Sequence, residues 1–306
     1  MIPTSIRAGR LEDLPELQRL HASSLRCYYY DDLADSGEPD LLKGVNAVLV
    51  DRHSDRLEGF VTFDSLRRSK ALPASAPTRV PLRAAAFSVG GAASRQQFRS
   101  LFEHAHRQLP PQPYGYLFCA LTEQGWLRAS LQESGFDRLD AVLFYERKSH
   151  SVGTVCQTAA LRPAQLSDLH KLAEIDAAAF EPLWHMGVTE LQHLHRDCRF
   201  EIAELAGSTV GYSALRLMSD GSPRGFGSAQ VVRLAVHPAV QGRGIGRQLL
   251  VACLCYASQL GINRVFLNTQ ESNLLSKKLY ESLNFKRRGR PVPVLVKIVS
   301  GSHARH

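Results

Sequence analysis

A glycine-rich segment in the second half of this 306-residue chain has the residue types that hold a phosphorylated ligand. From Val232 to Arg247 it reads VRLAVHPAVQGRGIGR. Glycines at 242, 244 and 246 let a ligand approach the backbone with no Cβ in the way. The helix expected to follow presents unpaired N–H groups and the positive end of its dipole. The segment therefore predicts a strand, a pyrophosphate-binding turn and a helix.

Two other phosphate-binding motifs do not account for this segment. A Walker loop needs Gly-Lys-Ser or Gly-Lys-Thr, and neither occurs in the sequence. A Rossmann loop belongs to the first strand–helix unit of its domain. This loop instead follows several expected elements of a domain that begins near residue 157.

Asn273 and Tyr280 form a second candidate pair, seven residues apart on a segment expected to be helical. Asn273 is suited to cap the start of that helix. Tyr280 carries a phenol that can donate a proton. It also stands beside Leu279 and near Leu283, at a spacing typical of core packing, so a structural role stays open.

These residues resemble the GNAT superfamily of N-acetyltransferases. Gln241 to Gly246 resembles its Gln/Arg-x-x-Gly-x-Gly signature, and the stretch from Asn273 to Phe285 resembles its Asn-x6-Tyr-x4-Phe element. The motifs cover roughly residues 228–286, and the weaker order of elements extends back to residue 161. The resemblance implies transfer of an acetyl group from acetyl-CoA to an amine.

The resemblance also implies roles for single residues. The backbone of Leu234, Ala235 and Val236 would bind the acetyl carbonyl and the pantetheine arm, and the N–H groups from Gln241 to Arg247 would hold the pyrophosphate. Asn273 would contact the cofactor arm, and Tyr280 would protonate the departing thiolate. The implied cofactor-binding residues are Leu234, Ala235, Val236, Gln241, Gly242, Arg243, Gly244, Ile245, Gly246, Arg247, Asn273 and Tyr280.

No general base follows from the sequence. Family members often place glutamates where this chain has Asn268 and Gln230, and neither side chain accepts a proton. A chain of waters ending on a more distant group is an alternative, with Glu201, Glu204, Glu271 and His237 as candidates. The acceptor stays open among small amines, antibiotics, peptide N-termini and lysine side chains. In this fold it usually borders the first helices, where Trp184 either lines the pocket or packs under a loop.

The elements that must position these residues occur twice. Ile6-Arg7 with Asp13 returns as Leu161-Arg162 with Asp168, Gly59 returns as Gly211, and Gly135-Phe136 returns as Asn284-Phe285. In the second copy we expect helices at 166–179, 244–259 and 273–282. Strands are expected at 199–205, 209–217, 228–236, 264–269 and 292–299.

The repeat predicts a mixed α/β (α+β) protein of two tandem GNAT-like domains, each a mostly antiparallel twisted sheet flanked by helices. Residues 1–149 would form a degenerate domain and residues 157–300 the catalytic one, joined by a polar linker near 148–157. The first copy has Ser88 to Arg95, SVGGAASR, where the cofactor loop is expected, so it lacks the Gly-x-Gly spacing.

Charge and cysteine content restrict the class of ligand and the cellular compartment that we expect. The net charge is +8, and residues 151–306 carry 18 Lys and Arg against 11 Asp and Glu. This positive excess suits either binding of the cofactor phosphates or a solvated surface. It does not favour binding of nucleic acid, because the basic residues are not interleaved with aromatic residues. The cluster lies at Lys277, Lys278, Lys286, Arg287, Arg288 and Arg290. Six cysteines are interpreted as buried thiols in a cytoplasmic protein without a membrane span.

A metal site is not expected, because His193, His195 and Cys198 would not share one helix face. The leading hypothesis is an acetyl-CoA-dependent N-acetyltransferase of unknown oligomeric state, with coenzyme A as product and a small-molecule or peptide amine as acceptor. The alternative is a non-catalytic module that binds acetyl-CoA and regulates a partner.

Overall fold

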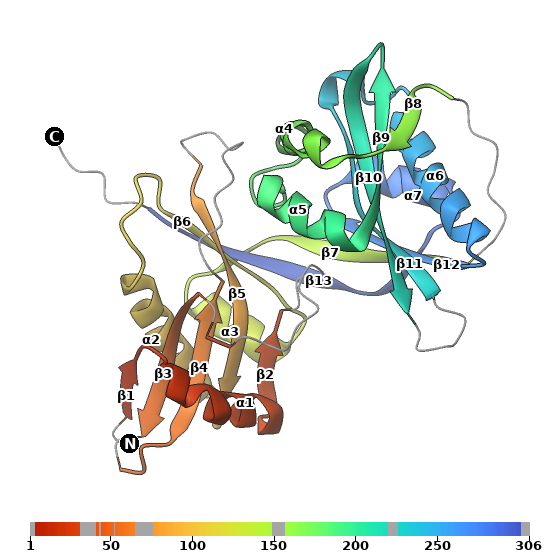
Figure 1. Ribbon diagram of the computed structural model, residues 1–306. Helices are drawn as coiled ribbons and strands as arrows, with labels where there is room; N and C mark the ends of the chain where they lie inside the picture. The colour runs from red at the N-terminus through yellow and green to blue at the C-terminus, as the bar shows by residue number, and fades with distance from the viewer. Residues whose placement is uncertain are drawn as a thin grey trace. The chain divides into compact units, whose positions relative to one another are not determined.

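A computed structural model describes residues 4–30, 41–42, 44–51, 53–64, 76–148, 157–219 and 226–300. These residues form two compact units (Figure 1). The first holds the described residues up to Asp140 together with residues 292–300. The second holds residues 141–148, 157–219 and 226–291. Residues 149–156 of the linker predicted near 148–157 lie outside the described part of the chain.

The first unit begins with a strand, a short 3-10 turn and a helix, followed by four strands and two further helices. Its elements are β1 (Thr4–Arg7), η1 (Leu11–Asp13), α1 (Leu14–Ser23), β2 (Arg26–Tyr29), β3 (Val45–Asp51), β4 (Leu57–Phe63), β5 (Thr78–Phe87), α2 (Ala92–Arg107), β6 (Tyr116–Leu121), α3 (Gly125–Glu133) and the start of β7 (Asp137–Lys148).

The second unit repeats this order with one exchange. Its elements are β8 (Ala160–Pro163), η2 (Leu166–Asp168), α4 (Leu169–Ala179), α5 (Val188–Asp197), β9 (Cys198–Leu205), β10 (Ser208–Ser219), β11 (Phe226–Val236), η3 (Pro238–Val240), α6 (Ile245–Gln259), β12 (Arg264–Gln270), α7 (Leu274–Ser282) and the start of β13 (Lys286–Val299). Where the first unit has the strand β2, the second has the helix α5.

The sheet of the second unit has the order β7-β12-β11-β10-β9-β8, and only β11 and β12 run parallel. Helices α4 and α5 lie on one face of this sheet and α6 and α7 on the other (Figure 1). Side chains of α6 and α7 pack on β11 and β12 in one core cluster that includes Leu250, Leu254, Val231 and Leu267. The mixed, mostly antiparallel α/β fold is thereby confirmed.

The first unit has the matching layers. Its sheet runs β1-β3-β4-β5-β6-β13, with β5 and β6 parallel. Leu17 and Leu20 of α1 pack on one face. Phe98 of α2 and Leu127 of α3 pack on the other. Alternation along the strands supplies apolar side chains to both faces, as expected for a sheet covered by helices on both sides.

The last strand of each repeat pairs outside its own segment of sequence. Residues 142–148 of β7 pair with β12 in the second unit, and residues 294–299 of β13 pair with β6 in the first. The compact units therefore do not coincide with the continuous ranges 1–149 and 157–300 that the sequence suggests. Pairings this far apart in sequence leave no local pattern that would reveal them.

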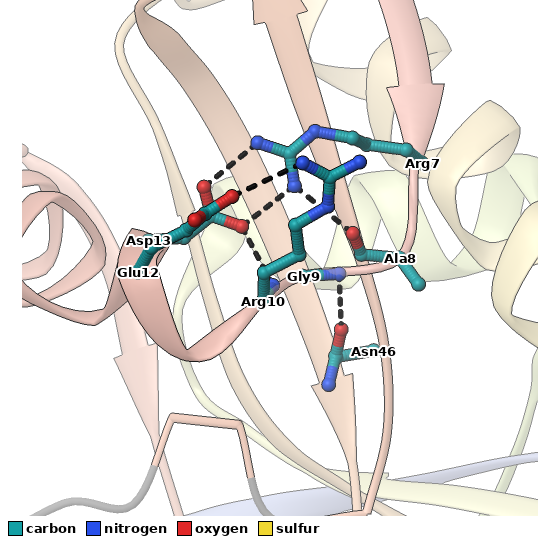
Figure 2. Close-up of polar contacts among 7 residues, drawn as sticks. All are labelled: Arg7, Ala8, Gly9, Arg10, Glu12, Asp13 and Asn46. Carbon is teal, nitrogen blue, oxygen red and sulfur yellow. Dashed lines mark hydrogen bonds and ion pairs between the residues drawn. The ribbon is translucent and has the colours of Figure 1, made fainter.

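The duplication reaches the level of single hydrogen bonds. In the first unit both terminal nitrogens of Arg7 donate to Asp13, at 2.6 and 2.7 Å, and the Arg10 N–H donates to the same carboxylate at 2.6 Å (Figure 2). In the second unit Arg162 donates to Asp168 at 2.8 and 2.9 Å, and the Gln165 N–H donates at 2.7 Å. Both carboxylates thus satisfy a backbone N–H at the start of a helical segment.

The helix that precedes the last strand also ends in the same way in both units. Gly135 and Asn284 have φ of 82° and 62°, the left-handed region expected after a helix. The next residue, Phe136 or Phe285, donates its N–H to the carbonyl of Leu131 or Tyr280 at 3.0 Å.

The predicted helices and strands of the second repeat are all present, but three features differ. Helix α5 was not expected, and β13 begins six residues earlier than predicted, at Lys286. Cys255 is exposed on α6, so the interpretation of all six cysteines as buried thiols is wrong. No described helix is both long and apolar enough to cross a membrane.

The paired Arg–Asp turns predict a pH dependence of stability. Hydrogen bonds from Arg7 and Arg162 lower the pKa of Asp13 and Asp168 below the ordinary value. A depressed carboxylate pKa stabilises the fold above the unfolded pKa of about 4, and this contribution is lost as the pH falls through and below that value. Asp168→Asn should therefore lower stability by about 1 kcal/mol at pH 7. Thermal melts from pH 7 to pH 3 should show the gap to wild type closing; a constant gap would contradict this assignment.

Candidate functional site

The second sheet opens at the point where the glycine-rich segment begins. The parallel pairing of β11 with β12 covers only Ala229–Val265, Gln230–Phe266 and Val231–Leu267. Beyond it, β11 continues to Val236 paired only with β10, and β12 continues to Gln270 paired only with β7. The backbone edge of β11 from residue 232 to 236 is thus left without a strand partner on that side, and a ligand can use its N–H and C=O groups.

A β-bulge marks the same place. Ala214 pairs with Arg233 and Leu215 with Val231, so Val232 is an extra residue on β11. Bulges bend and twist the strand that carries them. The bulge therefore accounts for the divergence of β11 from β12 at this residue.

The glycine turn lies at the open end. After Pro238 a short 3-10 turn leads to Gly242 and Gly244, whose φ values of 78° and 84° are in the left-handed region. Gly244 is the N-cap of α6. The first helical bond runs from the Gln248 N–H to the Gly244 carbonyl at 3.0 Å, so the preceding N–H groups of the helix point outward.

A pocket of about 500 Å³ joins the strand opening to this turn. Its walls come from β11, the glycine turn, the first two turns of α7 and the segment after α4. The lining residues are Ala179, Phe180, Glu181, Trp184, Leu234, Ala235, Val236, Val240, Gln241, Gly242, Gly244, Ile245, Gly246, Arg247, Gln270, Ser272, Asn273, Leu275, Ser276 and Leu279.

The pocket gathers ten of the twelve residues implied by the family resemblance, and Arg243 and Tyr280 are the two that do not line it. Asn273 caps α7, since its side-chain oxygen accepts the Ser276 N–H at 3.0 Å, and it also faces the pocket. The capping and ligand-facing roles therefore coexist. Trp184 lines the pocket as well, rather than only packing beneath a loop.

Tyr280 lies one layer behind the pocket wall. It is 6% exposed and packs against the rings of Tyr145 and Phe285. The Ser276 side chain, which does line the pocket, acts on the hydroxyl of Tyr280 and lowers its pKa, partly offsetting the effect of burial. Burial raises the pKa of the phenol, so Tyr280 stays protonated at neutral pH. The core-packing interpretation thus describes its ring, and its hydroxyl is influenced by Ser276, a residue of the pocket wall.

A buried ion pair that sequence reasoning missed holds the pocket walls together. The Asp176 carboxylate on α4 is fully buried and accepts from Arg233 Nε and Nη2 at 2.7 and 2.6 Å, and from the Tyr212 hydroxyl at 2.5 Å. It also accepts the Met186 N–H at 2.6 Å. Arg233 in turn donates to the Trp184 carbonyl at 2.7 Å and lies 3.6 Å above the centre of the Phe180 ring.

The charge on Arg233 survives its burial. Desolvation opposes it, but the attraction of Asp176 and their hydrogen bonds outweigh this, and the pKa of Arg233 is raised. Desolvation, reinforced by the Asp176 charge, raises the pKa of Tyr212 well above its ordinary value. The network is therefore a permanent ion pair with a neutral phenol, and it contributes no titrating group to the pocket.

The four residues considered as more distant general bases lie outside the pocket lining. Glu201 and Glu204 pair with Arg199 and Arg162 at 3.3 and 2.9 Å. His237 caps a turn, since its Nδ1 accepts the Ala239 N–H at 3.3 Å. Neither these residues nor Glu271 line the pocket. In the basic cluster, Arg288 pairs with Glu146 at 3.2 Å and the Lys277 ammonium donates to the Glu271 carbonyl at 2.7 Å.

The first unit has no such opening, because β2 fills it. Its parallel pair, β5 with β6, also stops after a few residues, at Pro81–Cys119. Beyond that point β2 pairs with Ala84 to Phe87 of β5. Phe87 pairs with Gly59 as Val236 pairs with Gly211, so β2 covers the backbone that corresponds to residues 233–236.

The turn of the first unit is occupied too. A Cβ built on Gly90 would lie 2.2 Å from a terminal nitrogen of Arg26, so the guanidinium of that β2 residue fills the space beside the turn. Tyr28 adds a hydrogen bond from its hydroxyl to the Leu121 carbonyl of β6 at 2.9 Å. Residues of the short strand β2 thus cover the backbone edge and fill the space beside the turn that stay open in the second unit.

The Asp176–Arg233 pair yields a stability prediction. Arg233→Met leaves a buried carboxylate without its cation, which costs about 3–5 kcal/mol of unfolding free energy. The double variant Asp176→Asn with Arg233→Met should lose clearly less than the two single variants combined. Urea unfolding measures both quantities. Arg199→Met is the matched control, since that arginine also has a carboxylate and a ring partner but is exposed, and it should cost at most about 1 kcal/mol. Equal losses for Arg233→Met and Arg199→Met would refute the assigned role.

Comparison with known sequences finds matches in the second half of the chain. Residues 169–285 match the acetyltransferase (GNAT) family. Mycothiol acetyltransferase of Thermobispora bispora is 36% identical over 90 residues, which is 29% of this chain and 30% of that protein. A ribosomal protein bS18 alanine N-acetyltransferase of Haemophilus ducreyi is 26% identical over 120 residues, 39% of this chain and 77% of that protein. The match thus spans less than half the length of the mycothiol acetyltransferases.

Comparison with solved structures covers both units. A GCN5-related N-acetyltransferase from Sphaerobacter thermophilus has a TM-score of 0.59 at 15% identity, over 98% of both chains. A tandem GNAT protein from the clavulanic acid biosynthesis pathway has a TM-score of 0.58 at 12% identity, over 98% of this chain and all of that one. At such identities the likeness concerns the fold. N-alpha-acetyltransferase RimI of Mycobacterium tuberculosis is 30% identical over 125 residues, 40% of this chain and 75% of that protein. With this relative, the family match in its second unit and this fold along its length, the chain belongs to the GNAT acetyltransferase family and has a tandem GNAT architecture.

Proposed function

We propose that the chain is an acetyl-CoA-dependent N-acetyltransferase whose second unit binds the cofactor and carries out the transfer. The observation that carries the proposal is the divergence of β11 from β12 after Val231, directly beside a glycine turn and a helix N-terminus. The three features form one pocket with room for an extended ligand. The family match supports the assignment.

The residues of the pocket fit acetyl-CoA in two parts. The outward N–H groups at the start of α6 and the Arg247 side chain suit a pyrophosphate. The unpaired backbone edge of Leu234 to Val236 suits an amide-containing arm, which it can bind as a strand would. The side-chain identities of those three residues matter little for such contacts. When bound, acetyl-CoA supplies the activated acetyl group.

The chain's own part in the transfer is to orient two reactants and to move protons. The edge of β11 holds the thioester, and the wall at Phe180 to Trp184 borders the acceptor. Tyr280, kept protonated by burial, would supply a proton to the departing thiolate by way of Ser276, the pocket-lining residue whose side chain acts on its hydroxyl.

A non-catalytic acetyl-CoA-binding module remains the second candidate. Two observations favour it: Gln230 and Asn268 replace family glutamates, and Tyr280 is set behind the wall. Turnover of acetyl-CoA with a panel of amines separates the two. The relatives are named mycothiol acetyltransferase and ribosomal protein bS18 alanine N-acetyltransferase, so both small-molecule and protein amines belong in that panel.

The first prediction here concerns cofactor stoichiometry. The full chain should bind acetyl-CoA at one site, since β2 covers the equivalent edge in the first unit. Gly244→Val should abolish binding, because valine is strained at a φ of 84° and its branched Cβ obstructs the approach of phosphate. Gly261→Val is the matched control, since Gly261 has a φ of 75° but ends α6 away from the pocket. Calorimetry that finds two equivalent sites, or unchanged affinity in folded Gly244→Val, would overturn this placement.

The second prediction concerns Tyr280. Tyr280→Phe removes the proton and keeps the ring, so kcat should fall by about 100-fold, the lower end of general acid effects, because a thiolate leaves fairly easily. Affinity for acetyl-CoA should change little. Tyr145→Phe removes the neighbouring phenol, which contacts Glu281, and serves as the control. Wild-type turnover in Tyr280→Phe would remove Tyr280 from the mechanism, and a lower melting temperature with a proportionate activity loss would leave it a purely structural role.

A further inference from the structure

One wall of the pocket comes from outside the cofactor-binding elements. It is the segment between α4 and α5, which contributes Phe180, Glu181 and Trp184. Because β11 and the glycine turn account for the cofactor, this wall faces the remaining reactant. Its side chains therefore decide which acceptor enters.

The backbone of this wall is fixed at both ends. The Glu181 carbonyl accepts the N–H groups of Trp184 and His185 at 2.8 and 3.2 Å, which closes a turn. Asp176 accepts the Met186 N–H, and Arg233 donates to the Trp184 carbonyl. Glu181 is thus carried on a turn tied to the buried ion pair, although its side chain is exposed.

The charges along the pocket are separated. Among the described residues that line it, Arg247 is the only cation and Glu181 the only carboxylate. Arg247 lies in the first turn of α6, where a phosphate is expected. Glu181 lies on the acceptor wall and forms no ion pair with a described residue, whereas Glu201 and Glu204 each do. The Arg233 charge beneath it is already neutralised by Asp176.

We propose that Glu181 binds the acceptor as an ammonium ion and takes its proton, and that the acceptor is a primary amine carried on an apolar or aromatic group. This inference rests on the proposed acetyltransferase function. Trp184 supplies the aromatic surface against which such a group packs. Glu181 thereby performs the task that Gln230 and Asn268 cannot perform.

The proton balance is complete without another reactant. The ammonium gives one proton to Glu181, which passes it to solvent, and the amine nitrogen attacks the acetyl carbon. As the carbon–sulfur bond breaks, Tyr280 gives its proton to the sulfur by way of Ser276, and the second proton lost by the nitrogen passes through solvent and restores the Tyr280 hydroxyl. The products are an N-acetyl amine, coenzyme A and one proton.

The test compares wild type, Glu181→Gln and Glu174→Gln on 2-phenylethylamine with acetyl-CoA from pH 6 to pH 10. Glu174 is an exposed carboxylate on α4 whose partner is Lys171, so its variant should behave as wild type. Glu181→Gln should lose about 100-fold or more in kcat/KM at pH 7. Its rate should rise about tenfold per pH unit, because it can use only amine already deprotonated in solution. Wild-type rates and profile in Glu181→Gln, with acetyl-CoA binding intact, would overturn the proposal.

A binding measurement separates this inference from the proposed function. Wild type loaded with coenzyme A should bind 2-phenylethylamine at least tenfold more tightly than 2-phenylethanol, which has no charge. Glu181→Gln should lose this preference, and Glu174→Gln should keep it. If wild type prefers the amine but acetylates none of the amines tested, the proposed transferase function is refuted and the binding role of Glu181 is not. Equal binding of amine and alcohol by wild type would refute the role of Glu181, whether or not other amines are acetylated.

Discussion

A single buried carboxylate, Asp176, sets the geometry of the pocket. It accepts four hydrogen bonds from three places in the second unit: the side chain of Arg233 on β11, the hydroxyl of Tyr212 on β10 and the backbone of Met186 before α5. Arg233 lies on the stretch of β11, residues 232–236, that has no strand partner on the β12 side. The carboxylate therefore fixes the segment between α4 and α5 relative to β11.

Such a network is a costly way to hold two elements together. Burying both charges forfeits their hydration, and apolar packing of the same volume often gives equal or greater stability. The ion pair instead fixes an orientation. A guanidinium donates two parallel hydrogen bonds to a carboxylate in only a few relative orientations of the two groups. A bulged strand and an irregular loop are difficult to position by packing alone. Their common tie to Asp176 explains how a pocket built from irregular backbone keeps one shape.

The parts that were predictable from sequence are those with local signals. The glycine turn, the capping asparagine and the positive φ at Asn284 each follow from residue type at a fixed offset from a helix. Asp176 gave no such signal, because an aspartate on a helix is usually solvated and its partners are 36 and 57 residues away. The same holds for β2: Arg26 to Tyr29 has the composition of a strand, but its site of insertion depends on β5, far along the chain. Hydrophobic periodicity carries no information on pairings between strands that lie far apart in the sequence.

The pairing of β6 with β13 has a consequence for the newly made chain. Tyr116 to Leu121, YLFCAL, is a six-residue apolar segment without charge, a composition prone to self-association. Its free edge is covered only by residues 294–299. At roughly 5–20 residues per second a ribosome needs about ten seconds or more to reach them, and during that time the edge stays open. The first unit of the nascent protein is thus vulnerable to aggregation until β13 has been synthesised and pairs with β6.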